Sequence, residues 1–424
     1  MKVSYGEGLA NQTGPEVWFI VVRLMQIKEQ IAILTNYPFP CKEPVLGNVF
    51  AKELGRLCEI IWFFQGDGTN IRTDKWHNSR LILCREIKGT SGFSKFINKI
   101  LEWRKILLLL YFVVFRGIKI VLVRDMPLAA LLIAPFRLIF GFKLYFQYTA
   151  PLGDIDLGFS RYNKTAKKWR YVIAGHLFNT LIRRTIKTSD LVFPITDFHK
   201  KELLSYTHEI KLIPITMGVD EEWISRKRTE VPYLKELKRN NTLIVYFGTL
   251  GLARKPQFLL KVFAEIKKKC PNTKLILIGN SLKNWEKKEL IDLCKSLGIN
   301  NHVIFTGFLN RNKLQDYLYY CDVSISPIPP ESYYIISSPT KLYESLGNGV
   351  PVVANREIYE QKKVILESGG GVVVDYDTKA FSNAIIQLIK DKKLRKEMAN
   401  KGKDYVIKNY SYQAIARKIA PYFM

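Results

Sequence analysis

The chain has 424 residues, a length that suits two domains of about 200 residues better than one very large core. Apolar residues make up 47% and charged residues 24%, which are ordinary globular values and exclude a disordered chain. Its 65 Lys and Arg against 38 Asp and Glu give a formal net charge of +27. Such a surface attracts polyanions, including nucleic acid, anionic membranes and phosphate-bearing substrates, although solvated lysines without any partner would give the same balance.

Cysteine usage and the first residues bear on the cellular compartment. The six cysteines are scattered without a C-x-x-C spacing, which favours reduced thiols in the cytoplasm over disulfides or a zinc site. The N-terminus lacks the charged region and apolar region of a signal peptide. Residues 1–28 begin with a polar, glycine-rich stretch, and we treat them as an extension of unknown structure.

Short β-branched runs alternate with helical patterns along the chain, which is typical of parallel sheets built from βαβ units. The strands expected in the first half are residues 30–37, 59–65, 118–125, 143–148, 191–197 and 211–216. Those expected in the second half are residues 243–248, 274–279, 302–307, 323–327, 350–354 and 371–375. Residues 221–241 are highly charged and contain a proline, so we expect them to link two domains.

No segment is expected to span a membrane. The apolar run at residues 106–115 ends at Arg116, and the run at residues 128–142 is interrupted by Pro135 and Arg137. Both fall short of the roughly 18–20 apolar residues that a bilayer requires. We expect helices buried in the first core, while attachment to a membrane surface stays open.

The segment from Leu157 to Ser189 is a candidate for surface binding because it contains no acidic residue. Its basic residues alternate with aromatic ones, a composition with which a helix can place rings among lipid headgroups and cations against anionic lipid. A solvated helix face explains the composition equally well. Nucleic-acid binding is less favoured, because no known nucleic-acid-binding motif accompanies the charge.

The first group of candidate site residues lies in the sequence YFGTLGLARKP. A strand ending at Gly248 is followed by a loop with Arg254 and Lys255 and then by a helical pattern. Such a loop lies at the carboxyl edge of a parallel sheet, where ligands bind in open α/β folds. An adjacent Arg and Lys there suit a diphosphate, although a basic pair in a loop is more often merely solvated.

The second group lies in the sequence SSPTKLYESLGNGVPVV. Ser338 is expected to cap a short helix whose free N–H groups can receive a phosphate. Glu344 shares a helix face with Thr340 and Lys341 and is expected to accept hydrogen bonds from ribose hydroxyls. A surface helix between two strands would explain the capping but not the flanking loops.

Taken as an ordered set, these motifs resemble the donor domain of the family 4 glycosyltransferases, which are retaining enzymes of the GT-B fold. The resemblance is carried by Gly248, Arg254 with Lys255, Gly279, FTGF at 305–308, CDVSISP at 321–327 and the block at 338–353. It implies an α/β protein of two doubly wound Rossmann-like domains facing a central cleft. The domains implied are an acceptor-binding domain at 29–220, a linker at 221–241, a nucleotide-sugar-binding domain at 242–408 and a helix at 409–424 that crosses back to the N-terminal domain.

The resemblance also implies roles for individual residues. Arg254 and Lys255 would bind the donor diphosphate and stabilise the departing nucleotide, as the catalytic residues. Glu344 would bind the ribose, and the backbone near Phe308 would bind the base. Gly47, in PVLGNVFAKEL, would open the first helix beside the donor phosphates.

Two positions depart from the family pattern. Many members carry an acidic residue eight positions before the ribose-binding Glu, where this chain has Ile336, so the usual contact to the sugar is missing and no role is assigned to Glu331. Many also place a His after the strand expected at residues 143–148, where this chain has Gln147 to Thr149. No catalytic base is therefore named.

The function implied is transfer of a sugar from a UDP- or GDP-sugar to a glycan or lipid-linked acceptor, in cell-surface polysaccharide or glycolipid synthesis. No D-x-D-like cluster is present, so we expect turnover without a metal ion or other cofactor. The enzyme would work in the cytoplasm, with an anionic membrane as a candidate partner through Leu157 to Ser189 and no nucleic acid. The alternatives are a GT-B nucleotide-sugar epimerase and a non-enzymatic basic adaptor for membranes or nucleic acid.

Overall fold

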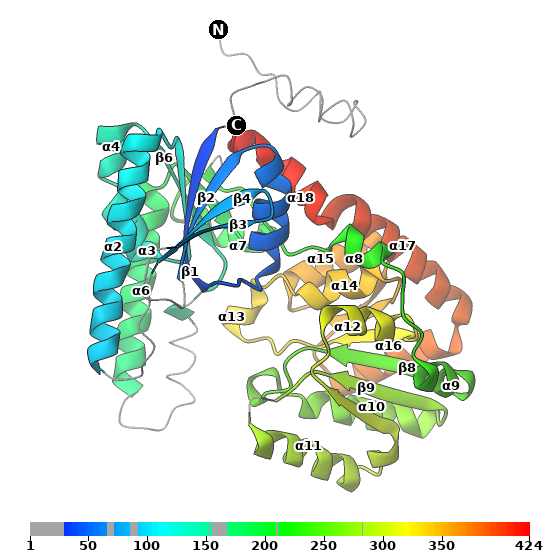
Figure 1. The fold of residues 1–424 in the computed structure, drawn as a ribbon. Helices are drawn as coiled ribbons and strands as arrows, with labels where there is room; N and C mark the ends of the chain where they lie inside the picture. Colours follow the sequence, from blue (N-terminus) through cyan, green and yellow to red (C-terminus); the bar gives the residue numbers. More distant parts are fainter. Residues whose placement is uncertain are drawn as a thin grey trace. The chain divides into compact units, whose positions relative to one another are not determined.

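The computed structural model describes residues 29–65, 72–84, 92–151, 153–154, 168–208, 211–281 and 283–424, which form two compact units (Figure 1). Unit 1 contains the described residues up to Ile195 together with His199–Ile215 and Tyr412–Met424. Unit 2 contains Thr196–Phe198 and Thr216–Ser411. The extension expected at residues 1–28 lies outside the described residues.

Unit 1 is built on a seven-stranded sheet with the order β3-β4-β2-β1-β5-β6-β7. All neighbouring strands are parallel except β3 and β4, which form an antiparallel hairpin at the edge. The strands are β1 (Gln30–Pro38), β2 (Glu59–Gln65), β3 (Arg72–Trp76), β4 (Ser79–Cys84), β5 (Ile120–Arg124), β6 (Lys143–Tyr148) and β7 (Leu191–Pro194).

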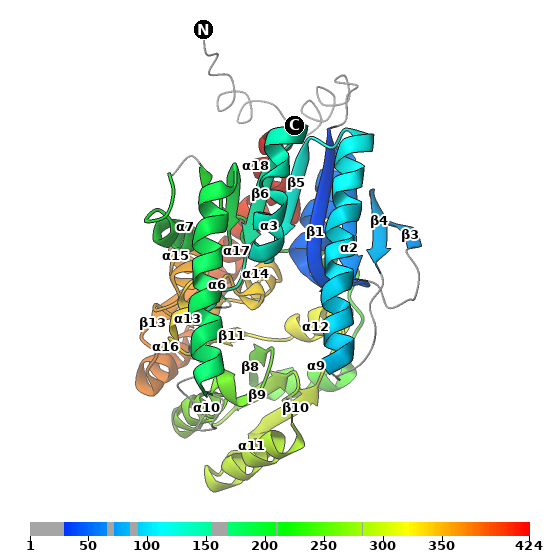
Figure 2. The ribbon, with the colours of Figure 1, turned by 90° about the vertical axis from the view of Figure 1, so that its left-hand side faces the viewer.

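Helices cover both faces of this sheet. They are η1 (Val45–Glu53), η2 (Leu54–Arg56), α2 (Gly92–Arg116), α3 (Pro127–Ile133), α4 (Phe136–Phe140), α6 (Lys168–Thr188), α7 (Asp197–Leu203), α18 (Tyr412–Ile419) and η6 (Ala420–Tyr422). Helices α2, α3 and α6 form one layer, with α3 packed against the other two (Figure 2). On the opposite face, η1 packs against α18.

The central strands of unit 1 are apolar on both faces because helices bury both. Ala32, Phe63 and Val121 belong to the core beneath α2, α3 and α6. An aromatic cluster fills the other face, where Phe423 stacks on Phe193 with ring centroids 5.4 Å apart. The C-terminal segment therefore completes the core of unit 1, as expected for a helix that returns to the N-terminal domain.

Unit 2 is built on a six-stranded, fully parallel sheet with the order β10-β9-β8-β11-β12-β13. Its strands are β8 (Thr242–Phe247), β9 (Thr273–Ile278), β10 (Val303–Gly307), β11 (Val323–Ser326), β12 (Val352–Asn355) and β13 (Gly371–Val374). All six strands expected in the second half of the sequence are present. Their signal was strong because each is a buried apolar run bounded by turn residues.

The helices of unit 2 also lie on two faces. They are α8 (Glu221–Ser225), α9 (Pro232–Asn240), η4 (Leu252–Arg254), α10 (Gln257–Lys269), α11 (Asn284–Ser296), η5 (Asn300–His302), α12 (Arg311–Leu318), α13 (Ser332–Ile335), α14 (Thr340–Gly347), α15 (Tyr359–Ser368), α16 (Thr378–Lys390) and α17 (Lys392–Tyr410). One core lies under α10, α11 and α16, and a second lies under α14, α15 and α17. Alternate residues of β8 enter each core, Tyr246 the first and Val245 the second.

The linker expected at residues 221–241 is a wrong prediction. This segment forms α8 and α9 within unit 2, where Trp223, Ile224 and Leu234 are buried in the core. Only a few of its residues are apolar, and the charged remainder is what suggested a linker. Asp220 caps α8 by accepting hydrogen bonds from the backbone of Glu222 and Trp223.

Two strand assignments in the first half also need correction. Residues 211–216 form no strand but a single bridge between Val192 and Leu212. The hairpin of β3 and β4 was missed, because Arg72–Trp76 is a polar edge strand without an apolar alternation. Among the described helices, none combines the length and the apolar character needed to cross a membrane.

Candidate functional site

The candidate site lies where the order of strands in unit 2 reverses. From β8 the chain proceeds outward through β9 to β10, and it then returns to place β11 on the other side of β8. The loops that follow β8 and β11 therefore leave the carboxyl edge of the sheet at its switch point, the place where folds of this type form a crevice. Crevices of this kind are where open α/β sheets bind their ligands.

Glycines end the strands at this edge and allow the backbones to approach closely. Gly248 has φ +135° and Gly279 has φ +139°, backbone conformations that residues other than glycine rarely adopt. A Cβ on Gly279 would lie only 1.9 Å from the carbonyl oxygen of Gly248. The strand ends are thus free of side chains, and a ligand can reach the main chain.

The loop after β8 carries both predicted catalytic cations. The Arg254 guanidinium lies over the ring of Tyr334, 4.1 Å from its centroid. The Lys255 ammonium forms an ion pair with Glu331 over 2.9 Å. Because Glu331 and Tyr334 belong to the segment after β11, these contacts join the two loops that border the crevice. Glu331, to which the sequence analysis assigned no role, thus has Lys255 as a structural partner.

Lys341 from α14 approaches the same point. Its ammonium lies 4.3 Å from the ring centroid of Tyr246 and 3.7 Å from the place where a Cβ of Gly248 would be. Burial, together with the positive charge of Arg254, lowers the pKa of Lys341 to about 7. The charge of Arg254 thus opposes protonation of Lys341, and an anion bound near both would relieve the repulsion.

The start of α14 differs from the expectation for Ser338. The helix begins at Thr340 with Pro339 as the capping residue, and no side chain caps it. The Ser338 hydroxyl is buried, accepts a hydrogen bond from the backbone of Met217 over 3.0 Å and lies 3.1 Å from the Tyr343 hydroxyl. Ser338 thus anchors the loop from inside. Thr340 is half-buried at the first turn of the helix.

Glu344 lies on the same helix, one turn after Lys341, and is half-buried. Its carboxylate is 3.9 Å from Arg311, which also pairs with Asp220 over 3.3 Å and lies over the ring of Trp223. Burial raises the pKa of Glu344 to about 7, while Arg311 opposes that rise. The carboxylate is therefore held in place and is poised to gain or lose a proton near neutral pH.

Phe308 follows β10 at the same edge of the sheet, with three quarters of its side chain exposed. Gly307, the residue before Phe308, lines a small pocket between the ends of β9 and β10 and helix α11. The lining includes Gly279, Asn280, Ser281, Phe305 and Gly307. The exposed, flat ring of Phe308 suits stacking against a nucleobase.

Gly47 lies in unit 1, whereas the residues above belong to unit 2. It sits in the π-helical turn η1, where a Cβ would come within 3.3 Å of the Trp76 ring. Close packing against this ring explains the glycine without a ligand. The role beside donor phosphates stays a prediction.

A second polar cluster, which the sequence analysis missed, lies at the carboxyl edge of unit 1. Arg124 is fully buried, 3.2 Å from Glu43, and donates a hydrogen bond to Gln147. The next residue, Asp125, has φ +51° and accepts a hydrogen bond from the backbone of Thr149 over 2.7 Å. Burial raises the pKa of Asp125. A strained residue beside a buried charge is typical of a functional site.

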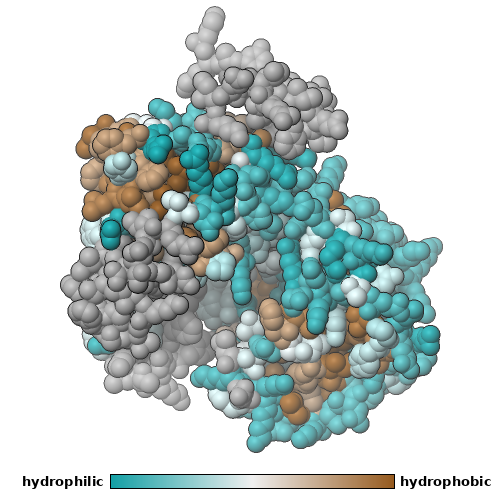
Figure 3. Space-filling model, viewed as in Figure 1, coloured by the Kyte–Doolittle hydropathy of each residue, from teal (hydrophilic) through white to brown (hydrophobic). Residues whose placement is uncertain are grey.

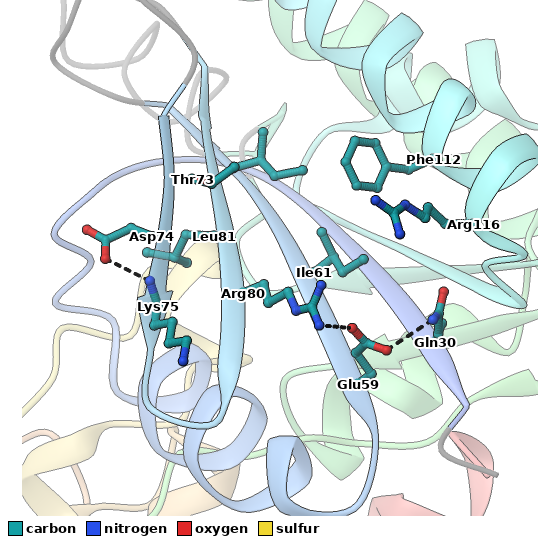
Figure 4. A pocket seen from close by; sticks show the side chains of 11 residues that line it. Gln30, Glu59, Ile61, Thr73, Asp74, Lys75, Arg80, Leu81, Phe112 and Arg116 are labelled. Atoms are coloured by element: carbon teal, nitrogen blue, oxygen red, sulfur yellow. Dashed lines mark hydrogen bonds and ion pairs between the residues drawn. The ribbon is translucent and has the colours of Figure 1, made fainter.

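Another pocket in unit 1 belongs to neither cluster. It measures about 540 Å³ and lies at the amino end of β1 and β2, beside the β3–β4 hairpin (Figure 4). Glu59 pairs there with Arg80 over 3.2 Å and accepts a hydrogen bond from Gln30. The Glu59 carboxylate is thus satisfied within the protein, and ligands of parallel sheets bind at the other edge.

The sequence analysis also missed Tyr246 and Tyr334, the two rings beneath the cations. Tyr246 looks like an ordinary core residue of a strand, and no sequence pattern reveals that a lysine from α14 covers it. Ile336 is buried and its carbonyl accepts a hydrogen bond from Thr196, so this position offers no acidic contact to a sugar. Within the described parts of the chain, no three His, Cys, Asp or Glu side chains are arranged to hold a metal ion.

Comparison with known proteins places this site in a family. Residues 233–405, all of them in unit 2, match the family model described as glycosyl transferases group 1. N-acetyl-alpha-D-glucosaminyl L-malate synthase of Bacillus anthracis is 24% identical over 56% of this chain and 60% of its own length. D-inositol 3-phosphate glycosyltransferase of Corynebacterium diphtheriae is 26% identical over 42% of this chain and 41% of its own length. The chain thus spans about half the length of such relatives.

Solved structures extend the similarity to both units. Sucrose-phosphate synthase of Thermosynechococcus elongatus superposes with a TM-score of 0.69 at 15% identity, covering 93% of this chain and 98% of the other. HepE of Anabaena in complex with UDP-glucose superposes with a TM-score of 0.64 at 16% identity and the same coverage. Residues 233–405 therefore form a domain of the glycosyl transferases group 1 family, within a chain that has the GT-B fold.

Proposed function

We propose that the protein is a retaining glycosyltransferase that moves a sugar from a nucleotide-diphosphate donor to a glycan or lipid-linked acceptor. The observation that carries this proposal is the position of two cations at the switch point of unit 2. Arg254 lies over the ring of Tyr334, and Lys341 lies over the ring of Tyr246 beside Gly248. Neither cation has a carboxylate partner among the residues that the structure describes. A diphosphate would supply the missing negative charge.

The proposed diphosphate site combines three kinds of donor. The Arg254 fork can chelate phosphate oxygens, and Lys341 supplies a point charge next to the exposed main chain of Gly248. The first N–H groups of α14 lie at the N-terminus of the helix, a place that favours anions. Lys255, paired with Glu331, holds the two loops together and adds positive charge at the rim.

The chemical step then follows from electrostatics. As the bond between the anomeric carbon and the phosphate oxygen breaks, its electron pair leaves with the nucleotide diphosphate, whose negative charge grows. Preorganised cations stabilise that growing charge most in a desolvated place. The acceptor hydroxyl attacks from the side that the leaving group departs from, and its proton passes to an oxygen of the departing phosphate. No protein base and no metal ion take part.

The remaining contacts assign the nucleoside. Glu344 in its ionised form would accept hydrogen bonds from the ribose hydroxyls, and Arg311 keeps that carboxylate in position. The main chain beside Phe308 would receive the base, which we take to be uracil or guanine. Gly47 and the Arg124 cluster belong to unit 1, which we assign to the acceptor.

The names of similar proteins support the donor class and the kind of pathway. HepE of Anabaena was solved with UDP-glucose, and a trehalose-6-phosphate enzyme of Escherichia coli was solved with UDP-2-fluoro glucose. One relative is named a lipopolysaccharide core biosynthesis glycosyltransferase. We accordingly place the enzyme in cell-surface glycan or glycolipid synthesis, acting in the cytoplasm at the inner face of the membrane.

A thermal-shift screen with UDP-, GDP-, ADP- and CDP-sugars tests the donor. A ligand at 100 times its Kd stabilises by about 2.7 kcal/mol, which for a unit of this size raises Tm by roughly 5–10 °C. We expect a shift with a UDP- or GDP-sugar that Arg254→Ala abolishes and Arg356→Ala, at an exposed ion pair elsewhere in unit 2, preserves. Transfer of labelled sugar to an acceptor would complete the case. Release of an epimerised free sugar without any acceptor would overturn it.

A further inference from the structure

The helical layer of unit 1 exposes apolar side chains along its outer side. Helix α2 buries Leu109 and Val113 against the sheet, while the opposite side carries an exposed stripe at every fourth residue. This stripe consists of Trp103, Leu107, Tyr111 and Phe115. Helix α6 repeats the arrangement with Trp169, Ile173 and Leu177. The outer sides of both helices are therefore apolar where a water-facing helix is polar.

Among the described residues of unit 1, helix α4 has the most exposed large apolar side chains. Leu138 is 83% exposed and Ile139 is 70% exposed. Helices α2 and α4 end close together, because the strands that follow them, β5 and β6, are neighbours in which Ile120 pairs with Lys143. Figure 3 shows the resulting apolar surface over α4 and the adjoining end of α2. We call the outer sides of α2, α4 and α6 the apolar face.

The described charged side chains of α2, α4 and α6 have one sign, because all of them are basic. The exposed cations at the end shared with α4 are Arg116, Lys119, Lys143 and Lys187. Two acidic neighbours have partners already: Asp190 is paired with Arg137 over 2.7 Å, and Asp154 accepts a hydrogen bond from Asn179 of α6.

We propose that the apolar face binds the surface of an anionic membrane, with α2 and α6 lying along it and the Leu138–Ile139 tip inserted among the lipid headgroups. An apolar centre with a cationic rim is the composition of a membrane-surface element. The sequence analysis sought this contact in Leu157 to Ser189. The structure assigns it instead to α2 and α4, joined by the described part of α6. Residues 155–167 lie outside what is described.

Charge decides between the membrane and other partners. A second copy of the chain would bring two cationic rims together, which like-charge repulsion disfavours. Nucleic acid would match the cations but leave the leucines and isoleucines against water. An anionic bilayer satisfies both features at once. The proposal does not depend on the donor or on the reaction catalysed.

Flotation of the full-length protein with vesicles tests the proposal. The vesicles contain phosphatidylglycerol and phosphatidylcholine in one series and phosphatidylcholine alone in the other. We expect flotation with the anionic vesicles, at least tenfold weaker partitioning for Leu138→Glu with Ile139→Glu, and unchanged partitioning for Leu366→Glu, at an exposed apolar residue of unit 2. Lys119→Gln with Lys143→Gln should lower partitioning about 25-fold, since each surface cation contributes about fivefold.

Each other outcome contradicts the proposal. Absent flotation of the native protein, equal flotation of the α4 variant, or equal binding to both kinds of vesicle would each overturn it. Loss of a dimer in the α4 variant, with flotation unaffected, would assign the apolar face to self-association. The thermal shift caused by nucleotide sugars shows whether donor binding in unit 2 survives the substitutions in unit 1. It also separates failure of this proposal from failure of the proposed function.

Discussion

The carboxyl edges of the two sheets use positive charge in opposite ways. In unit 1, Arg124 is buried against Glu43 and hydrogen-bonded to Gln147, so its charge is satisfied by the protein. In unit 2, burial and the positive charge of Arg254 lower the pKa of Lys341 to about 7. An arginine that is already paired holds its surroundings in place. Cations left together without a counter-ion are ready for an anionic ligand.

The largest effect that the comparison predicts is on the stability of unit 1. Arg124→Met removes the charge but retains much of the volume, which leaves Glu43 and Asp125 as buried carboxylates without their cation. Breaking a buried pair in this way costs about 3–5 kcal/mol. We expect a loss of that size in the free energy of unfolding of unit 1, measured by denaturant titration. A loss below about 1 kcal/mol would show that the cluster is not a structural pair.

The matching change in unit 2 should spare stability and abolish activity. Arg254→Ala removes a cation that repels Lys341, so the free protein should be as stable as the native one or slightly more so. Loss of one preorganised donor to a developing charge lowers kcat by about 10²–10³-fold. Steady-state transfer kinetics and denaturant titration measure the two effects. Arg356→Ala serves as the matched control for loss of one positive charge.

The same comparison explains what the sequence could and could not reveal. Gly248, Arg254 and Lys341 were identified because strand-ending glycines and adjacent cations follow from local patterns. Arg124 was missed because the sequence does not show which carboxylates a buried arginine meets, and Glu43 lies 81 positions away.

The errors within unit 2 have a related cause. Ser338 was assigned as a helix cap from its neighbours in sequence, but its hydroxyl is used by the backbone of Met217, a contact across 121 positions. The supposed linker contains Trp223 and Leu234, whose burial depends on α12 and α14. Local propensity thus located the strands of the fold and the charges of the site. It failed where a partner distant in sequence decides the role of a side chain.

A smaller effect concerns the pH dependence of donor binding. Lys341 is protonated below pH 7 in the free protein, and a bound diphosphate should raise its pKa. Above pH 7, Lys341 therefore takes up a proton when the donor binds. The Kd should rise by up to about tenfold per pH unit until the pH reaches the pKa of Lys341 in the complex. Glu344 has the opposite effect, because it loses its negative charge as the pH falls through about 7.

Calorimetric titration with an intact nucleotide sugar measures the Kd as a function of pH, because the diphosphate of such a donor does not titrate in this range. The resulting profile has an alkaline limb due to Lys341 and an acidic limb due to Glu344. Lys341→Met should remove the alkaline limb and leave the acidic one. Glu344→Gln should remove the acidic limb. Binding that is independent of pH between 6 and 9 in the native protein would contradict the assignment of both residues.

The smallest expected effect is that of removing divalent metal ions. Arg254, Lys341 and the first turn of α14 together supply positive charge and hydrogen bonds where a metal-dependent transferase would place Mg²⁺ against the diphosphate. If those groups carry the leaving-group charge, EDTA should change kcat by less than about twofold, and added Mg²⁺ or Mn²⁺ should not restore the activity of Arg254→Ala. Complete loss of activity in EDTA, reversed by Mg²⁺, would mean that the two cations position the donor while a metal ion stabilises its departure. The paired charge of Arg124 in unit 1 and the unpaired charges of Arg254 and Lys341 in unit 2 would still differ. That difference would then explain donor binding rather than catalysis.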